Sequence, residues 1–195
     1  MHKGLVDLNT DMLNKTLKKC LPEQLQQRSV SAVLLALGSN HHAEYYLPHV
    51  RKQLAELGEV SLSTAFQNPD FTATLAQPKP DYTNQCVYLS LTSTMTLQQL
   101  QQTFKKFEGD CKRQHLTEPN GIRQVTMDID ILLIKLSTDN NSLDDNNTLL
   151  DNSTLNDECI TEWGAHWIIM ADRYPFKEHE RVGVEELVAN NFVTN

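Results

Sequence analysis

Residues 123–135 read Arg-Gln-Val-Thr-Met-Asp-Ile-Asp-Ile-Leu-Leu-Ile-Lys and predict a β-strand that carries two carboxylates. Most of these residues are β-branched or apolar, as is typical of strands in a buried sheet. Because successive strand side chains point to opposite faces, Asp128 and Asp130 leave from one side and their apolar neighbours from the other. Two acids on one face repel each other and lose hydration, which a cation or a shared proton would offset. On this pair alone, a divalent metal site and a polar strand face that is simply hydrated both remain open.

Length and composition indicate one cytoplasmic domain of ordinary size with extensions. The chain has 195 residues, which is enough for one real core. No apolar run approaches a membrane span and the N-terminus shows no apolar stretch of signal-peptide length, so we expect no membrane partner. The cysteines are scattered without a Cys-x-x-Cys pair, which is typical of reduced thiols in a cytosol. They are Cys20, Cys86, Cys111 and Cys159.

The formal net charge of −8 comes largely from one segment. Residues 137–158 contain six acids and no Lys or Arg, so the rest of the chain carries only −2. Their low complexity predicts a loosely ordered insertion. Several cationic side chains gather just before the two aspartates, as an anionic substrate that carries its own metal would need, although a hydrated helix end has the same composition. They are Lys105, Lys106, Lys112, Arg113, His115 and Arg123.

The periodicity of the remaining chain predicts an α+β fold of the ferredoxin-like type, with elements in the order β-α-β-β-α-β. In that arrangement the helices cover one face of the sheet and leave the other free to bind a ligand. Tyr82 and Asn84 share one strand face and are candidates for the free side, together with Asp128 and Asp130. The predicted strands are residues 30–37, 60–66, 82–92 and 123–135. One predicted helix follows the turn at Gly38, and the other covers residues 96–111.

The same patterns divide the chain into four parts. We predict a helical extension at residues 1–30, where leucines recur at helical spacing, and a ferredoxin-like core at 31–136. The acidic low-complexity insertion follows at 137–158. Residues 159–195 are expected to pack on the core and to end in a short helix at 184–188.

Five short motifs, in order over residues 32–135, together resemble the hydroxymethyldihydropterin pyrophosphokinase family of the folate pathway. The resemblance implies Mg²⁺-dependent transfer of pyrophosphate from ATP to the hydroxymethyl group of a reduced pterin, 6-hydroxymethyl-7,8-dihydropterin. Such transfer depends on cations that neutralise phosphate charge and needs no covalent nucleophile. The motifs are Leu37-Gly38-Ser39-Asn40, Asn68-Pro69, Asp81-Tyr82-Thr83-Asn84, Glu108 with Arg113, and Thr126-Met127-Asp128-Ile129-Asp130-Ile131-Leu132.

The resemblance also implies roles for individual residues. Asp128 and Asp130 would bind two Mg²⁺ ions that arrive with ATP, and Arg113 and Arg123 would act with them in catalysis. Asn84 would read the amide edge of the pterin with one donor and one acceptor. The other implied nucleotide contacts, besides Arg113, are Glu108, Lys112 and His115, and the implied pterin pocket contains Gly38, Asn68, Pro69, Phe71, Tyr82, Asn84 and Trp167.

Three functional hypotheses follow from these observations. The first is an active pterin pyrophosphokinase with ATP and a reduced pterin as partners. The second is a catalytically weakened or inactive paralogue that binds a pterin as a regulatory module, because the family's Pro-His and Arg-Gly-Phe motifs have no clear counterpart here. The third, an RNA-binding domain, would need an aromatic-rich central strand. Residues 125–135 contain no aromatic residue and two aspartates, so we expect no nucleic-acid partner. The oligomeric state is left open, with a monomer favoured.

Overall fold

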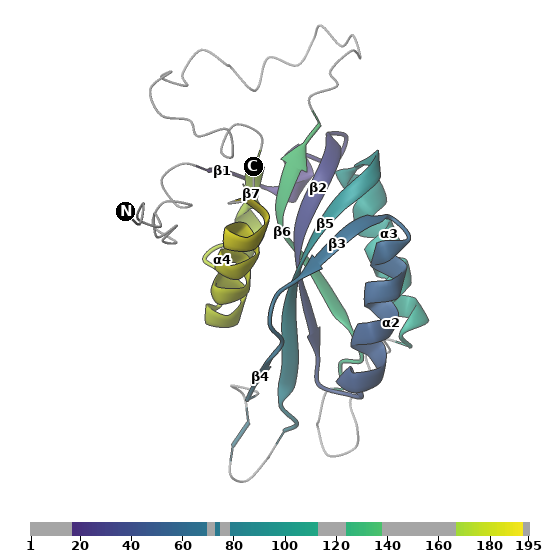
Figure 1. The fold of residues 1–195 in the computed structure, drawn as a ribbon, viewed down its shortest axis with the longest axis vertical. Coiled ribbons are helices and arrows are strands. Elements are labelled where there is room, and N and C mark those ends of the chain that lie inside the picture. Colours follow the sequence, from purple (N-terminus) through teal and green to yellow (C-terminus); the bar gives the residue numbers. More distant parts are fainter. Residues whose placement is uncertain (1–16, 70–72, 75–78, 113–123, 138–166, 193–195) are drawn as a thin grey trace, which may run out of the picture.

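The computed structural model describes residues 17–69, 73–74, 79–112, 124–137 and 167–192. Within these ranges the chain forms one mixed seven-stranded sheet that has helices on both faces (Figure 1). The predicted α+β class is confirmed. None of the described helices is long and apolar enough to cross a membrane. The three cysteines that lie in the described ranges, Cys20, Cys86 and Cys111, are free thiols.

Strand β2 (Ser29–Ser39) is the centre of the sheet, because its sequence is apolar on both faces. It pairs antiparallel with β5 (Tyr82–Thr96) on one side and with β6 (Asp128–Leu136) on the other. The full order is β1-β7-β6-β2-β5-β3, and β4 pairs with β5 beside this path. The remaining strands are β1 (Lys18–Cys20), β3 (Gly58–Leu62), β4 (Phe66–Asn68) and β7 (Trp167–Met170).

Helices α2 (Ala43–Ala55) and α3 (Leu97–Asp110) pack on one face of this sheet (Figure 1). Helix α3 begins at the predicted capping box, in which Thr96 Oγ1 accepts from the Gln99 amide at 3.2 Å and Gln99 Oε1 accepts from the Thr96 amide at 2.8 Å. The apolar stripe of the helix is buried against the sheet. The prediction that the two helices cover one face of the sheet is confirmed.

Helix α4 (Glu178–Phe192) covers much of the opposite face, which we expected to be free (Figure 1). Its Val184, Leu187 and Val188 are buried in a second apolar cluster with side chains of β2, β5, β6 and β7. At Gly183, a Cβ would lie 2.6 Å from Cys86 Sγ, so only glycine allows the helix this close to β5. The prediction of a wholly free face is wrong, because α4 covers much of it. Among the described residues, a cavity remains at the end of the sheet near the start of α4.

The N-terminal extension forms no α-helix where the structure describes it. Lys18–Cys20 form β1, which pairs parallel with β7, and Pro22–Gln24 form one 3₁₀ turn. Proline breaks the leucine pattern that suggested a helix, and the exposed edge of β7 offers backbone partners instead. Residues 1–16 and the acidic stretch 138–158 lie outside the described residues.

Candidate active site

The two aspartates leave the same face of β6, as the alternation predicted. Asp128 is opposite Gly38 of β2 and Asp130 is opposite Ala36, while Ile129 on the other face is buried in the core. Gly38 makes room at this point, because a Cβ there would lie 3.1 Å from Asn84 Oδ1 and 4.0 Å from Asp128 Cβ. The missing side chain lets the Asn84 amide and the Asp128 carboxylate approach one open space.

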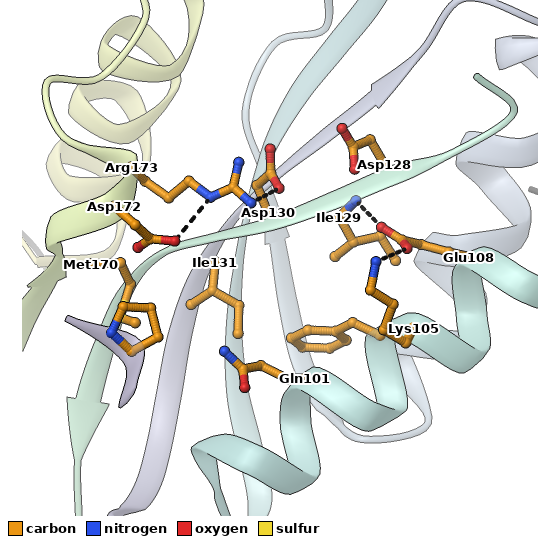
Figure 2. Close-up of a pocket in the computed structure, with 12 residues that line it drawn as sticks. Gln101, Lys105, Glu108, Asp128, Ile129, Asp130, Ile131, Met170, Asp172 and Arg173 are labelled. Atoms are coloured by element: carbon orange, nitrogen blue, oxygen red, sulfur yellow. Dashed lines mark hydrogen bonds and ion pairs between the residues drawn. The ribbon is translucent and has the colours of Figure 1, made fainter. Parts of the chain in front are cut away.

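The negative charge of the Asp130 carboxylate is only partly compensated by its neighbours. Its burial, together with the charge of Asp128, raises the pKa of Asp130 from 3.8 to about 6. Arg173 opposes this shift through an ion pair of 2.7 Å from its Nη2 to Asp130 Oδ1, and its Nε lies 3.6 Å from Asp172 Oδ2 (Figure 2). Since the pKa stays raised despite this arginine, a further cation beside the two carboxylates would be favourable.

A cavity of about 500 Å³, here called the larger cavity, opens along the edge of β6 beyond the end of β7 (Figure 2). Glu108 of α3 lies at its wall and is only 4% exposed. One carboxylate oxygen accepts a hydrogen bond from the Ile129 amide at 2.9 Å, and the other lies 3.2 Å from Lys105 Nζ. The cavity is lined by Pro22, Gln101, Phe104, Lys105, Glu108, Asp128, Ile129, Asp130, Ile131, Met170, Asp172 and Arg173. Glu108 therefore fixes the edge of the strand that carries the aspartates.

A cavity of about 250 Å³, here called the smaller cavity, lies on the sheet face beside the start of α4. Asn68 of β4 is opposite Tyr82 of β5, and Asn84 is two residues further along, so the three side chains share this face. The cavity is lined by Ala36, Leu37, Gly38, Asn68, Pro69, Tyr82, Asn84, Asp128, Asp130, Lys177, His179 and Glu180. It combines amide groups with one aromatic ring, and both aspartates line it as well as the larger cavity.

Several residues of the C-terminal segment line the two cavities and were missed by the sequence analysis. Arg173 follows β7, and Lys177 and His179 lie at the start of α4. Glu180 fixes this start, because its carboxylate accepts from the Lys177 amide at 2.8 Å and lies 3.3 Å from Lys177 Nζ. Burial lowers the pKa of His179, which favours a neutral imidazole. The only signal was a run of charged residues around Pro175, and the long acidic insertion hid its relation to the aspartates.

The structure brings together five of the residues predicted for the pterin pocket, and it does not bring Trp167 to them. Gly38, Asn68, Pro69, Tyr82 and Asn84 line the smaller cavity. Trp167 is 2% exposed in the cluster beneath α4, where its ring centroid lies 6.2 Å from that of Tyr88, and it is not among the lining residues of either cavity. Strand β7 aims this side chain into the core. Lys112 is exposed just past α3 and lines neither cavity. Phe71, Arg113, His115 and Arg123 lie outside the described residues.

The two aspartates fit a hard divalent cation that is only partly held by protein. Among the described residues, no group of three or more His, Cys, Asp or Glu side chains could hold a metal ion. Mg²⁺ is commonly bound through one or two carboxylates, with water and substrate phosphate in the other positions. The raised pKa of Asp130 is consistent with this fit, because a cation would relieve the charge that burial and Asp128 disfavour.

Comparison with known proteins identifies one family. The model of the family described as 7,8-dihydro-6-hydroxymethylpterin-pyrophosphokinase (HPPK) matches residues 34–154, which is more than half of the chain. No curated protein matches the chain. The matched range includes Gly38, Asn84 and both aspartates, and it ends before Arg173 and α4.

Proposed function

Because the chain belongs to the 7,8-dihydro-6-hydroxymethylpterin-pyrophosphokinase family, we propose that it is an active enzyme of folate biosynthesis. It would transfer pyrophosphate from ATP to the hydroxymethyl group of 6-hydroxymethyl-7,8-dihydropterin and release AMP. One observation carries the proposal: two cavities of different size and chemistry meet at a single pair of carboxylates. A reaction between a triphosphate and a hydroxymethyl group on a heterocycle needs such a junction.

The larger cavity suits the triphosphate. Lys105 and Arg173 bring positive charge to its wall, and both side chains retain contact with solvent. Asp128 and Asp130 would hold the Mg²⁺ ions at the inner end of this cavity. When bound, Mg²⁺ supplies positive charge to the phosphate oxygens and orients them for attack. Arg113, Lys112, His115 and Arg123 stay predictions as further contacts for ATP or for catalysis.

The smaller cavity suits the pterin. Tyr82 offers a ring face for stacking, and the Asn84 amide offers one donor and one acceptor to the amide edge of the heterocycle. Lys177, just before α4, and His179, in its first turn, line this cavity and would keep water from the bound ring. A pterin held here would direct its hydroxymethyl group toward the aspartates. The phosphorus that it attacks would then lie just beyond them.

Arg173 connects the free and the loaded site. In the free protein its guanidinium forms an ion pair with Asp130, and 43% of its side chain is exposed. We assign it a second partner in the loaded enzyme, a phosphate oxygen of ATP, once Asp130 is occupied by a cation. Arginine suits this exchange because its guanidinium forks around carboxylate and phosphate oxygens equally well.

A second candidate function is the inactive paralogue that binds a pterin. The Arg173–Asp130 ion pair favours it, because an internal cation on a metal-binding carboxylate is what a protein without metal chemistry would retain. Under either function we infer a ferredoxin-like core, in which β2, α2, β3, β5, α3 and β6 occur in this order, with the short β4 between β3 and β5. The cytoplasmic location, the monomeric state and the four-part division of the chain belong to the same proposal.

The deciding experiment is calorimetric titration of the protein with hydroxymethylpterin and then with a non-hydrolysable ATP analogue plus Mg²⁺, followed by an AMP-release assay. We expect both ligands to bind, AMP to form, and Asp128→Ala to abolish nucleotide binding and AMP formation. Asp110→Ala, which removes an exposed acid at the end of α3, should behave like the wild type. Pterin binding without ATP binding would favour the inactive paralogue, and binding of neither ligand would refute both functions.

A further inference from the structure

In the free protein, a side chain of the protein already occupies one of the two carboxylates proposed for Mg²⁺. Arg173 Nη2 lies 2.7 Å from Asp130 Oδ1, a distance typical of a charge-assisted hydrogen bond (Figure 2). Only 13% of the Asp130 side chain is exposed, so the guanidinium covers much of the access that a cation would need. A free cation that binds Asp130 must therefore displace Arg173 or share the carboxylate with it.

The guanidinium of Arg173 also weakens the attraction of the site for a free cation. It offsets one of the two negative charges of Asp128 and Asp130, and a divalent ion bound between them would lie beside a second positive charge. A triphosphate in the larger cavity changes this balance, because its oxygens can pair with the metal ion and with the guanidinium at the same time.

Arg173 has an alternative position at hand. Its side chain is 43% exposed, and its Nε lies 3.6 Å from Asp172 Oδ2. Arg173, Asp172 and Asp130 all line the larger cavity, where the triphosphate is proposed to bind. The guanidinium can therefore leave Asp130 and remain within this cavity, between Asp172 and a phosphate oxygen.

We infer that Arg173 determines which form of the metal the site accepts: it weakens binding of the free ion and favours the ion that arrives with a triphosphate. This inference rests on the proposed function and deepens it. Arg173 follows β7 and lies outside residues 34–154, the range that matches the family model. The metal ion and the triphosphate each relieve a cost of binding the other, so their binding is coupled.

The test measures free metal and nucleotide separately in Arg173→Ala. Mn²⁺ is the probe, because it takes the same carboxylate and water ligands as Mg²⁺ and the unbound ion can be counted by electron paramagnetic resonance. Without nucleotide, the variant should bind Mn²⁺ about fivefold more tightly than the wild type, as expected when one partly exposed competing ion pair is removed. It should bind the ATP analogue with Mg²⁺ at least tenfold more weakly. A merely structural role would weaken both.

Two further variants locate the effect. Asp130→Asn combined with Arg173→Ala should abolish the gain in Mn²⁺ affinity, because the ion then loses its carboxylate. Lys105→Ala is the matched control, since Lys105 also brings positive charge to the larger cavity but pairs with Glu108, at 3.2 Å. It should weaken binding of the ATP analogue and leave the affinity for free Mn²⁺ unchanged.

The outcomes distinguish this inference from the proposed function. Unchanged or weaker Mn²⁺ binding in Arg173→Ala would overturn the inference and leave the proposed function standing. An equal gain in Lys105→Ala would also overturn it, because the general charge of the cavity would then oppose the free ion. Failure of the wild type to bind the ATP analogue with Mg²⁺ would refute the proposed enzyme and the inference together.

Discussion

Replacing Asp130 with asparagine should make the metal-free protein more stable at neutral pH and should abolish Mg²⁺-dependent nucleotide binding. Asparagine keeps the shape of the side chain and removes its charge. The Asp130 side chain is only 13% exposed, and burial together with Asp128 raises the pKa of Asp130 to about 6. The site therefore holds a charge that destabilises the folded protein until a cation binds.

The magnitude follows from the shift in pKa between the unfolded and the folded protein. A rise from 3.8 to about 6 is about two units, and at about 1.36 kcal/mol per unit it corresponds to a penalty on the order of 3 kcal/mol. The folded state binds the proton more tightly, so the penalty is complete above about pH 6, about half as large near pH 5, and lost below about pH 4. The attraction of Arg173 already lowers this pKa, and in the variant Arg173 stays hydrated beside Asp172.

The assay is thermal unfolding of the wild type and Asp130→Asn in the presence of a chelator, across this pH range. At pH values near 7.5 we expect the variant to gain about 1–3 kcal/mol, which raises the melting temperature by about 3–10 °C for a domain of this size. Asp110→Asn, at an exposed site, should change little. A variant less stable than the wild type at neutral pH, or a difference that does not shrink on acidification, would refute the electrostatic reasoning.

Three further predictions concern the neighbours of Asp130. Arg173→Ala should weaken binding of the ATP analogue at least tenfold in calorimetry and leave pterin binding unchanged, and it should cost less than about 1 kcal/mol in unfolding free energy because the ion pair with Asp130 is partly exposed. The control Arg181→Ala, which breaks an ion pair with Glu185 on α4, should not affect binding of the ATP analogue. Equal effects of the two substitutions would contradict the role assigned to Arg173. Gly38→Ala should lower pterin affinity about tenfold, because the new Cβ would lie 3.1 Å from Asn84 Oδ1 and would displace this amide. If the variant bound the pterin as tightly as the wild type, Asn84 would not contact the ring. Glu108→Ala should lower the free energy of unfolding in urea by about 1–3 kcal/mol, because the buried Ile129 backbone amide loses its acceptor. Glu108→Gln, which keeps an acceptor oxygen, should cost much less. Equal losses would show that the charge of Glu108 matters more than this hydrogen bond.

The elements whose signals are local could be predicted from the amino-acid sequence. Alternation along residues 128–131 put both aspartates on one strand face, because side-chain direction in a strand depends only on position parity. The capping box and the apolar stripe that follows it predicted α3. This signal is also local, because Thr96 and Gln99, which form the capping box, lie within one helical turn. Gly38, Asn68, Tyr82 and Asn84 were predicted as pterin contacts through ordered motifs and do line one cavity.

The way in which the C-terminal segment completes the site depends on tertiary contacts and could not be predicted from the sequence. Strand β7 pairs antiparallel with β6 in a register that puts Ile169 opposite Leu133. Because β7 ends one residue later, the next turn lies beside the part of β6 that carries Asp130, and Arg173 reaches its carboxylate. The same register buries Trp167, which the sequence assigned to the pterin pocket. These contacts join residues more than thirty positions apart in the sequence. They depend on strand register and on the burial of apolar faces, which no local pattern in the sequence encodes.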